Sequence, residues 1–193
     1  MANRSYLYSC DHLPGSDEWT RSKSLHGISE WRYDIPLVFR ILLTGNPVAC
    51  RSSIWDTPEN IAIAGDYAQG RAHLSAYLAR IKDPAARPLV DEALEFLNSP
   101  AHARRHFILE CGEIFDLMDK GSPGEHNSTL LKEIWELAAT LDSLQPPEPV
   151  KAGKGFLSAL FRRKAPDPLR PYYDVGLGFW SDILYFDFTH NEA

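Results

Sequence analysis

The sequence has few cysteines, and they do not form a cysteine pair of the kind that binds metals or forms redox centres. Its 193 residues include only Cys10, Cys50 and Cys111, and none of them belongs to a CxxC motif. An odd number of widely spaced cysteines argues against a disulfide framework and favours reduced, buried side chains. We therefore expect three free thiols in a cytoplasmic protein.

Long apolar runs are also missing, and we expect no secretory leader. No run approaches the roughly 20 apolar residues that a membrane-spanning helix requires. Arg4 and Tyr6 interrupt the N-terminus where a signal peptide would be apolar. The hydrophobic fraction of 44% and the charged fraction of 24% are typical of a globular protein. The sequence thus predicts a single domain over residues 1–193, without stable membrane association.

Signatures of catalysis are scarce. The sequence contains no complete phosphate-binding loop and no GxSxG motif. The nearest approach to a site is formed by His102, His106 and Glu110, whose spacing of four would place them on one face of a helix, where they could bind zinc. Arg104 and Arg105 would repel a cation there, so we favour a solvated helix face. We expect no catalytic residue and no metal or other cofactor; an enzyme of unrecognised type using the His/Glu set is the alternative.

Charge is distributed unevenly along the chain. The net charge is -6, yet residues 151–170 carry +5, so the remainder carries -11. An acidic body disfavours nonspecific nucleic-acid binding and favours a basic protein partner. Carboxylates concentrate in residues 110–142, where helical spacing spreads them into a band. The alternative is an ordinary solvated face. The candidate partner-binding residues are Glu110, Glu113, Asp116, Asp119, Glu133 and Glu136.

The basic segment "GKGFLSALFRRK" places helically spaced apolar residues, Phe156, Leu157, Leu160 and Phe161, beside a basic cluster. Such a pattern can lie on an anionic membrane or in a partner's groove, and it can also dock on its own domain. Prolines and glycines around it predict that residues 145–170 form a mobile excursion or linker within the domain. A peripheral membrane adaptor is therefore a second alternative function.

Helical periodicity dominates the centre of the chain. A buried helix is predicted within residues 34–47, and four more follow at 66–83, 85–98, 99–120 and 127–144. Asn127 or Ser128 is the expected N-cap of the last one. Residues 15–30 are predicted to form a loop. Residues 54–65 fit a strand through Ile61 and Ile63, or a helix start through Pro58, and their structure stays open.

Both ends of the chain predict strands. Residues 4–10 are rich in tyrosine, and Leu184, Phe186 and Phe188 alternate in the closing segment. A lone strand cannot satisfy its backbone groups, so we expect the two ends to pair. The predicted fold class is mainly α with a small β-sheet (α+β): a helical bundle with N- and C-terminal strands paired.

The opening "MANRSYLYS" and the closing "GFWSDILYFDF" resemble a group of uncharacterised bacterial proteins that begin with MANRSYLY. Small acidic proteins of this kind are similar to the immunity proteins of bacterial toxin systems. The resemblance covers the two ends of the chain and brings no catalytic residue. It implies a non-catalytic binding protein that neutralises a cognate toxin by occluding the active site of that toxin.

Overall fold

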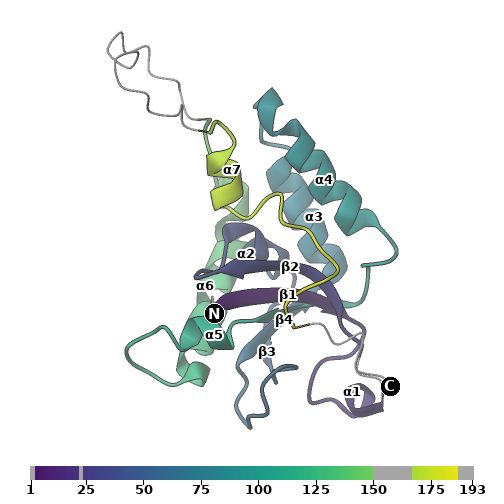
Figure 1. Cartoon of the computed structure of the whole chain (residues 1–193), viewed down its shortest axis with the longest axis vertical. Helices are drawn as coiled ribbons and strands as arrows, with labels where there is room; N and C mark the ends of the chain where they lie inside the picture. The colour runs from purple at the N-terminus through teal and green to yellow at the C-terminus, as the bar shows by residue number, and fades with distance from the viewer. Residues whose placement is uncertain (1–2, 22–23, 150–166, 187–193) are drawn as a thin grey trace.

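A five-stranded antiparallel sheet organises the protein (Figure 1). The computed structural model describes residues 3–21, 24–149 and 167–186. The strand order is β2-β1-β5-β4-β3. The strands are β1 (Arg4–Cys10), β2 (His26–Arg32), β3 (Val48–Cys50), β4 (Ala62–Asp66) and β5 (His106–Glu110).

Helices gather mainly on one side of this sheet. Figure 1 shows α2, α3 and α4 together above the strands, and α5 lower at the left, beside the N-terminal end of β1. Within the described ranges, no helix has the length and apolar character needed to cross a membrane. The helices are α1 (Asp17–Arg21), α2 (Leu37–Leu42), α3 (Tyr67–Leu78), α4 (Arg87–Asn98), α5 (Gly112–Phe115), α6 (Pro123–Thr140) and α7 (Arg170–Asp174), with 3-10 turns at Pro84–Ala86 and Leu141–Ser143.

The prediction of a mainly α helical bundle is wrong, because the sheet forms the centre of an α+β fold. Residues 99–120, predicted as one helix, contain β5 and the short α5. Phe107, Ile108 and Leu109 are all buried, because β5 is a central strand covered on both faces. The spacing from Phe107 to Ile114 and Phe115 imitates a helical stripe across the break at Gly112.

Among the described residues, the two ends of the chain do not pair as strands. β1 lies between β2 and β5, with Tyr6 opposite Glu30 on one side and Glu110 on the other. The C-terminal segment contributes one isolated bridge, between Trp180 and Ser29. Residues 181–186 form no strand. Residues 187–193 lie outside the described part of the chain, as do residues 150–166 of the predicted excursion.

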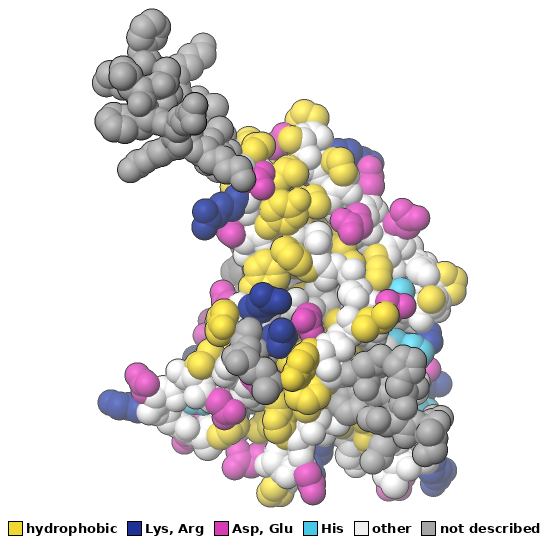
Figure 2. Space-filling model, viewed as in Figure 1, with side chains coloured by type: hydrophobic (Ala, Val, Ile, Leu, Met, Phe, Trp, Pro, Cys, Tyr) yellow, Lys and Arg dark blue, Asp and Glu magenta, His cyan; other side chains and the backbone are white. Residues whose placement is uncertain are grey.

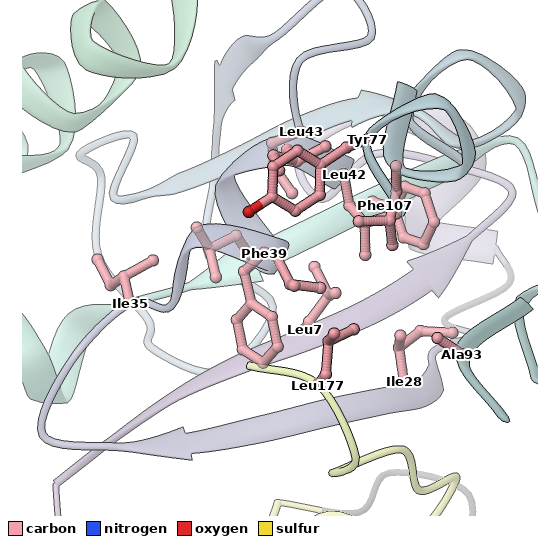
Figure 3. Packing of buried hydrophobic residues seen from close by; sticks show 14 of the residues in the cluster. Leu7, Ile28, Ile35, Phe39, Leu42, Leu43, Tyr77, Ala93, Phe107 and Leu177 are labelled. Atoms are coloured by element: carbon pink, nitrogen blue, oxygen red, sulfur yellow. The ribbon is translucent and has the colours of Figure 1, made fainter. Parts of the chain in front are cut away.

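The larger apolar core lies between the sheet and the helices. Strand side chains alternate between faces, and Leu7 and Phe107 point to the helix-covered face. Figure 3 shows these two side chains meeting Phe39 and Leu42 of α2 and Tyr77 of α3. All five are buried.

The predicted helix within residues 34–47 is confirmed as the short, buried α2, and the helices at 66–83 and 85–98 are confirmed as α3 and α4. The side chain of Asp66 caps α3 by accepting a hydrogen bond from the N–H of Gln69 at 2.8 Å. Gly70 lets α3 approach α2 closely, because a Cβ there would overlap the carbonyl oxygen of Leu42. Absence of a side chain at this position therefore sets how closely the two helices pack.

The other face of the sheet is covered by loops and short elements. Tyr6, Tyr8 and Ile108 point to it from the strands, and Trp19 of α1 and Leu184 of the C-terminal segment pack on them. This loop-covered face has a smaller apolar cluster than the helix-covered face.

Three local predictions need correction or completion. Residues 15–30, predicted as a loop, contain α1 and most of β2. Residues 54–65, left open, form a loop that leads into β4. The predicted helix at 127–144 starts earlier, since Ser122 and Glu125 form a capping box. Asn127 lies inside α6, buried, and its Nδ2 donates to the carbonyl oxygens of Asn60 and Ala62.

Candidate functional site

The predicted acidic band does not form one surface, because Glu110 is completely buried. Its carboxylate accepts hydrogen bonds from the Ser52 hydroxyl at 2.8 Å, and from the Ser53 N–H and hydroxyl at 2.6 and 2.7 Å. Burial raises the pKa of Glu110 to about 7, although the serine hydrogen bonds favour the charged form and oppose the rise. Glu110 therefore anchors the loop after β3 and cannot contact a partner.

The carboxylate of Glu113 is also engaged in hydrogen bonds within the fold. Its carboxylate accepts hydrogen bonds from the Tyr6 hydroxyl at 2.9 Å and from the N–H of Arg4 at 2.8 Å. Burial, and then the neighbouring Glu113 carboxylate, raise the pKa of the Tyr6 hydroxyl. Glu113 thus connects α5 to β1.

Glu133 and Glu136 lie on the exposed surface of α6, away from the other candidates. Glu133 pairs with Arg40 of α2 at 3.1 Å, and Glu136 pairs with Lys132 at 3.8 Å. A helical rise of 1.5 Å per residue puts Glu133 about 15 Å along α6 from Pro123. Exposed pairs of this kind contribute little to stability.

Asp116 lies in a different setting, a surface hollow of about 290 Å³. We call it the acidic hollow, because three carboxylates line it beside an indole ring and no basic side chain does. These four residues are Trp55, Asp56, Glu59 and Asp116. The three carboxylate residues are exposed. Of the other candidates, Asp119 is exposed in the loop between α5 and α6.

Acidic surface continues from this hollow across the N-terminus of α6. Glu59 also lines a shallow neighbouring depression together with Glu125. The Glu59 carboxylate accepts a hydrogen bond from the N–H of Gly124 at 3.0 Å. That N–H belongs to the first turn of α6, where peptide donors have no partner within the helix. Glu59 is therefore held in place and contributes charge to both depressions.

Trp55 is positioned from two sides. The Ser52 hydroxyl oxygen accepts a hydrogen bond from the Trp55 N–H at 2.9 Å, while the Ser52 hydroxyl itself donates to Glu110. The indole ring lies on Gly112, where an added Cβ would be only 3.0 Å from the ring. The buried Glu110 therefore holds Ser52 in place, and Ser52 in turn positions Trp55 at the side of the acidic hollow.

The predicted His/Glu set has no helical face in this structure. His102 lies in a turn and stacks on Phe96, with ring centroids 3.8 Å apart, whereas His106 begins β5. Among residues 3–21, 24–149 and 167–186, no three His, Cys, Asp or Glu side chains could together hold a metal ion. Burial lowers the pKa of both His102 and His106.

The three cysteines are buried and free, as the sequence predicts. Burial raises the pKa of Cys10 to about 12 and that of Cys111 well above its usual value. Such thiols are poor nucleophiles, because the thiolate is the reactive form.

Most of the lining of the acidic hollow, including Trp55 and two of its three carboxylates, comes from residues 54–65, whose structure the sequence left open. "WDTPEN" places Trp55, Asp56 and Glu59 around a proline, a composition typical of an exposed turn. An aromatic ring between carboxylates in such a turn is the signal that could have identified them. Their proximity to Asp116 depends on α5 and could not be read from spacing.

Comparison with known families finds a match over most of the chain. A family model described as a domain of unknown function (DUF7822) matches residues 11–147. Neither the curated proteins nor the solved structures include a significant match. The matched range contains β2, β3, β4, β5 and the whole acidic hollow, whereas β1 and the C-terminal segment lie outside it.

Proposed function

Since the chain belongs to the family of the domain of unknown function DUF7822, we propose its role from its surface: it is a non-catalytic binding protein that receives a basic side chain of a protein partner in the acidic hollow. The observation that carries this proposal is the grouping of Asp56, Glu59 and Asp116 around the Trp55 ring, with no basic side chain in the lining.

The chemistry of the hollow suits a lysine or arginine side chain. Its three carboxylates attract a cation, and the face of an indole ring adds a favourable cation–π contact with Trp55. A volume of about 290 Å³ lies just below the range of about 300 to 1,000 Å³ for sites that take drug-sized ligands. It therefore fits one inserted side chain better than a small-molecule substrate.

The state of the titratable groups supports a non-catalytic role. A general acid or base must reach the substrate and titrate near the working pH. Glu110 has a pKa of about 7, but it is fully buried and bonded to Ser52 and Ser53. The carboxylates of the hollow are exposed to solvent, where they act as charges for docking.

The specific form of this role is that of a cytoplasmic immunity protein. The resemblance of "MANRSYLYS" and "GFWSDILYFDF" to bacterial proteins of this type supports it, and three buried free thiols fit a reducing compartment. In this proposal a basic cognate toxin docks through a lysine or arginine at its active site, and the bound protein occludes that site.

The experiment is to express the chain with the product of the neighbouring gene and to measure association rates at low and high salt. Reversing the hollow charges with Asp56→Lys, Glu59→Lys and Asp116→Lys is expected to slow association about tenfold or more at low salt and less at high salt. The matched control reverses three exposed carboxylates on α4, with Asp91→Lys, Glu92→Lys and Glu95→Lys.

Equal slowing by both variants would mean that net charge, rather than the hollow, steers association. If no neighbouring product binds, the immunity role is wrong. Circular dichroism on both variants checks that the fold is kept.

A further inference from the structure

The outer edge of β2 carries a second surface feature, larger than the acidic hollow. A groove of about 630 Å³ lies between residues 30–32 of β2 and residues 179–181 and Ile183 of the C-terminal segment. We call it the edge groove. Neighbouring strand residues point to opposite faces, so Trp31 lines the groove from one face of the sheet, and Glu30 and Arg32 from the other. The backbone edge of β2 therefore lies within the groove.

The C-terminal segment covers only part of this edge. Trp180 bridges Ser29, and the N–H of Ser181 donates to the carbonyl oxygen of Ile28 at 3.1 Å. Further along, Gly27 lies so close to the backbone of Asp182 that a Cβ would overlap it. These contacts block residues 27–29 of β2 against any other strand.

Beyond this bridge the edge is open. Tyr33 donates its N–H to the carbonyl oxygen of Asn3, so the backbone of Tyr33 faces β1. Successive residues of an antiparallel strand alternate in direction, and the backbone N–H and C=O of Arg32 therefore point outward, away from β1. No residue of the described ranges hydrogen-bonds to that outward peptide group of Arg32. An unpaired strand edge is a template for another extended chain.

Exposed apolar side chains gather at the same place. Phe179 is 46% exposed and Ile183 is 71% exposed, and Tyr33 and Tyr185 are also exposed. The Trp31 ring meets the Phe179 ring edge-on, with centroids 4.9 Å apart. Figure 2 shows hydrophobic side chains with basic ones beside them on the face over β1, β2 and the C-terminal segment. Concentrated exposed apolar area of this kind marks interaction sites.

Of the two charged side chains that line this groove, only the positive one, Arg32, lacks an ion-pair partner among the described residues, although the protein is acidic overall. Glu30 is engaged, since it pairs with Arg4 at 3.1 Å and accepts a hydrogen bond from the N–H of Tyr185. Arg32 is exposed, and its guanidinium has no ion-pair partner among the described residues. A carboxylate on the occupant would therefore find a cation without having to displace an existing partner.

We propose that the edge groove binds an extended segment of a protein partner by strand addition to β2. The segment pairs its backbone with the open edge at Arg32, places an apolar side chain against Trp31 and Phe179, and directs a carboxylate to the Arg32 guanidinium. This recognition mode draws affinity from main-chain hydrogen bonds and specificity from side-chain pockets. It goes beyond the acidic hollow, since it selects a partner segment of the opposite charge.

The probe is a set of acetylated heptapeptides that alternate valine and threonine, carry a central phenylalanine, leucine or isoleucine, and end in aspartate. Binding is followed by the amide resonances of residues 30–32 and by tryptophan fluorescence. We expect shifts confined to the edge groove, and at least tenfold weaker binding when alternate peptide nitrogens are methylated, because methylation removes the donors of a strand.

Substitution in the protein tests the charge. Arg32→Glu is expected to weaken binding at least tenfold, while Arg21→Glu, at an exposed arginine on α1, changes it less than twofold. Both sites are on the surface, and circular dichroism checks the fold of each variant. Replacing the terminal aspartate of the peptide by lysine should weaken binding by a factor similar to that for Arg32→Glu.

Three results would overturn the proposal. The first is an absence of shifts at residues 30–32 with every peptide at concentrations up to about 1 mM, which is enough to reveal even weak complexes. The second is equal binding of the methylated peptides, which would exclude strand addition. The third is a dimer of this chain that the Arg32→Glu variant dissociates, because the groove would then be an interface between two copies. Binding of a basic partner through the acidic hollow is a separate result, and it does not alter the meaning of any of these three.

Discussion

The two faces of the sheet are built from alternate residues of the same strands, yet they differ in chemistry. The helix-covered face is apolar and packs Leu7 and Phe107 against Phe39 of α2. The loop-covered face places the titratable residues Tyr6 and Glu110 under a loop and the C-terminal segment. The first arrangement favours stability, and the second holds surface loops in place through hydrogen bonds to buried polar groups.

The largest expected effect concerns the helix-covered face. Phe39→Ala should lower the free energy of unfolding by about 3 to 5 kcal/mol, because Phe39 is fully buried and its removal leaves a cavity. Urea unfolding measures the loss. The control is Leu117→Ala, at a residue that is 51% exposed, with an expected change within about 0.5 kcal/mol. A loss for Phe39→Ala that matches the control would mean that α2 is not part of the stabilising core.

A smaller effect, dependent on pH, is expected from the loop-covered face. The folded protein binds the proton of Glu110 more tightly than the unfolded chain, because burial raises its pKa from 4.5 to about 7. The contribution is therefore fully present below pH 4.5 and is lost as pH rises through about 7. The loss between those values should amount to about 2 to 3 kcal/mol.

Glu110→Gln should remove this pH dependence, since glutamine stays neutral. Unfolding by urea between pH 4.5 and 8, compared between the two proteins, isolates the contribution of Glu110. His26, His102 and His106 have pKa values lowered by burial and act in the opposite direction, with stability lost as pH falls. They are present in both proteins and cancel in the comparison. Parallel pH profiles would contradict the expected role of the carboxyl.

The smallest expected effect concerns the hydrogen bond between Ser53, in the loop after β3, and the buried carboxyl of Glu110. Ser53→Ala removes the hydroxyl that donates to Glu110 at 2.7 Å. At pH 8, where Glu110 is charged, the loss should be about 1.5 kcal/mol, and at pH 5 it should be smaller. Ser143→Ala, at an exposed hydroxyl bonded to the carbonyl of Thr140, serves as the control. An equal loss of unfolding free energy at both pH values would show that the contribution of Ser53 to stability does not depend on the charge of Glu110.

The sequence predicts those elements whose local pattern and packing agree. β1, α3 and α4 have clear periodicity and, for α3, a cap at Asp66, and all three form as expected. β2 is missed because Gly27 and Glu30 are poor strand formers, and both contact the C-terminal segment, which no local pattern reports. β5 is missed because an apolar run covered on both faces has no alternation to distinguish it from a helix.

The candidate site was predicted less well than the fold. Asp116 lines the acidic hollow, but Glu110 was placed on a surface from which it is excluded. That error follows directly from the helix predicted at 99–120, since Glu110 ends β5 and Glu113 lies in α5, so the two carboxylates meet different partners. Trp55 and Glu59 come near Asp116 only through the tertiary fold, and no spacing in the sequence reports such a contact.

The position of β1 inside the sheet also has a consequence for synthesis. Its partner β2 follows soon after it, but its other partner β5 is made about 100 residues later, which takes roughly 5 to 20 s on the ribosome at 5–20 residues per second. During that time one edge of β1 has no partner, and such an edge can pair with strands of other nascent chains. The β1–β2 pair therefore depends on β5, made late in synthesis, to close this edge.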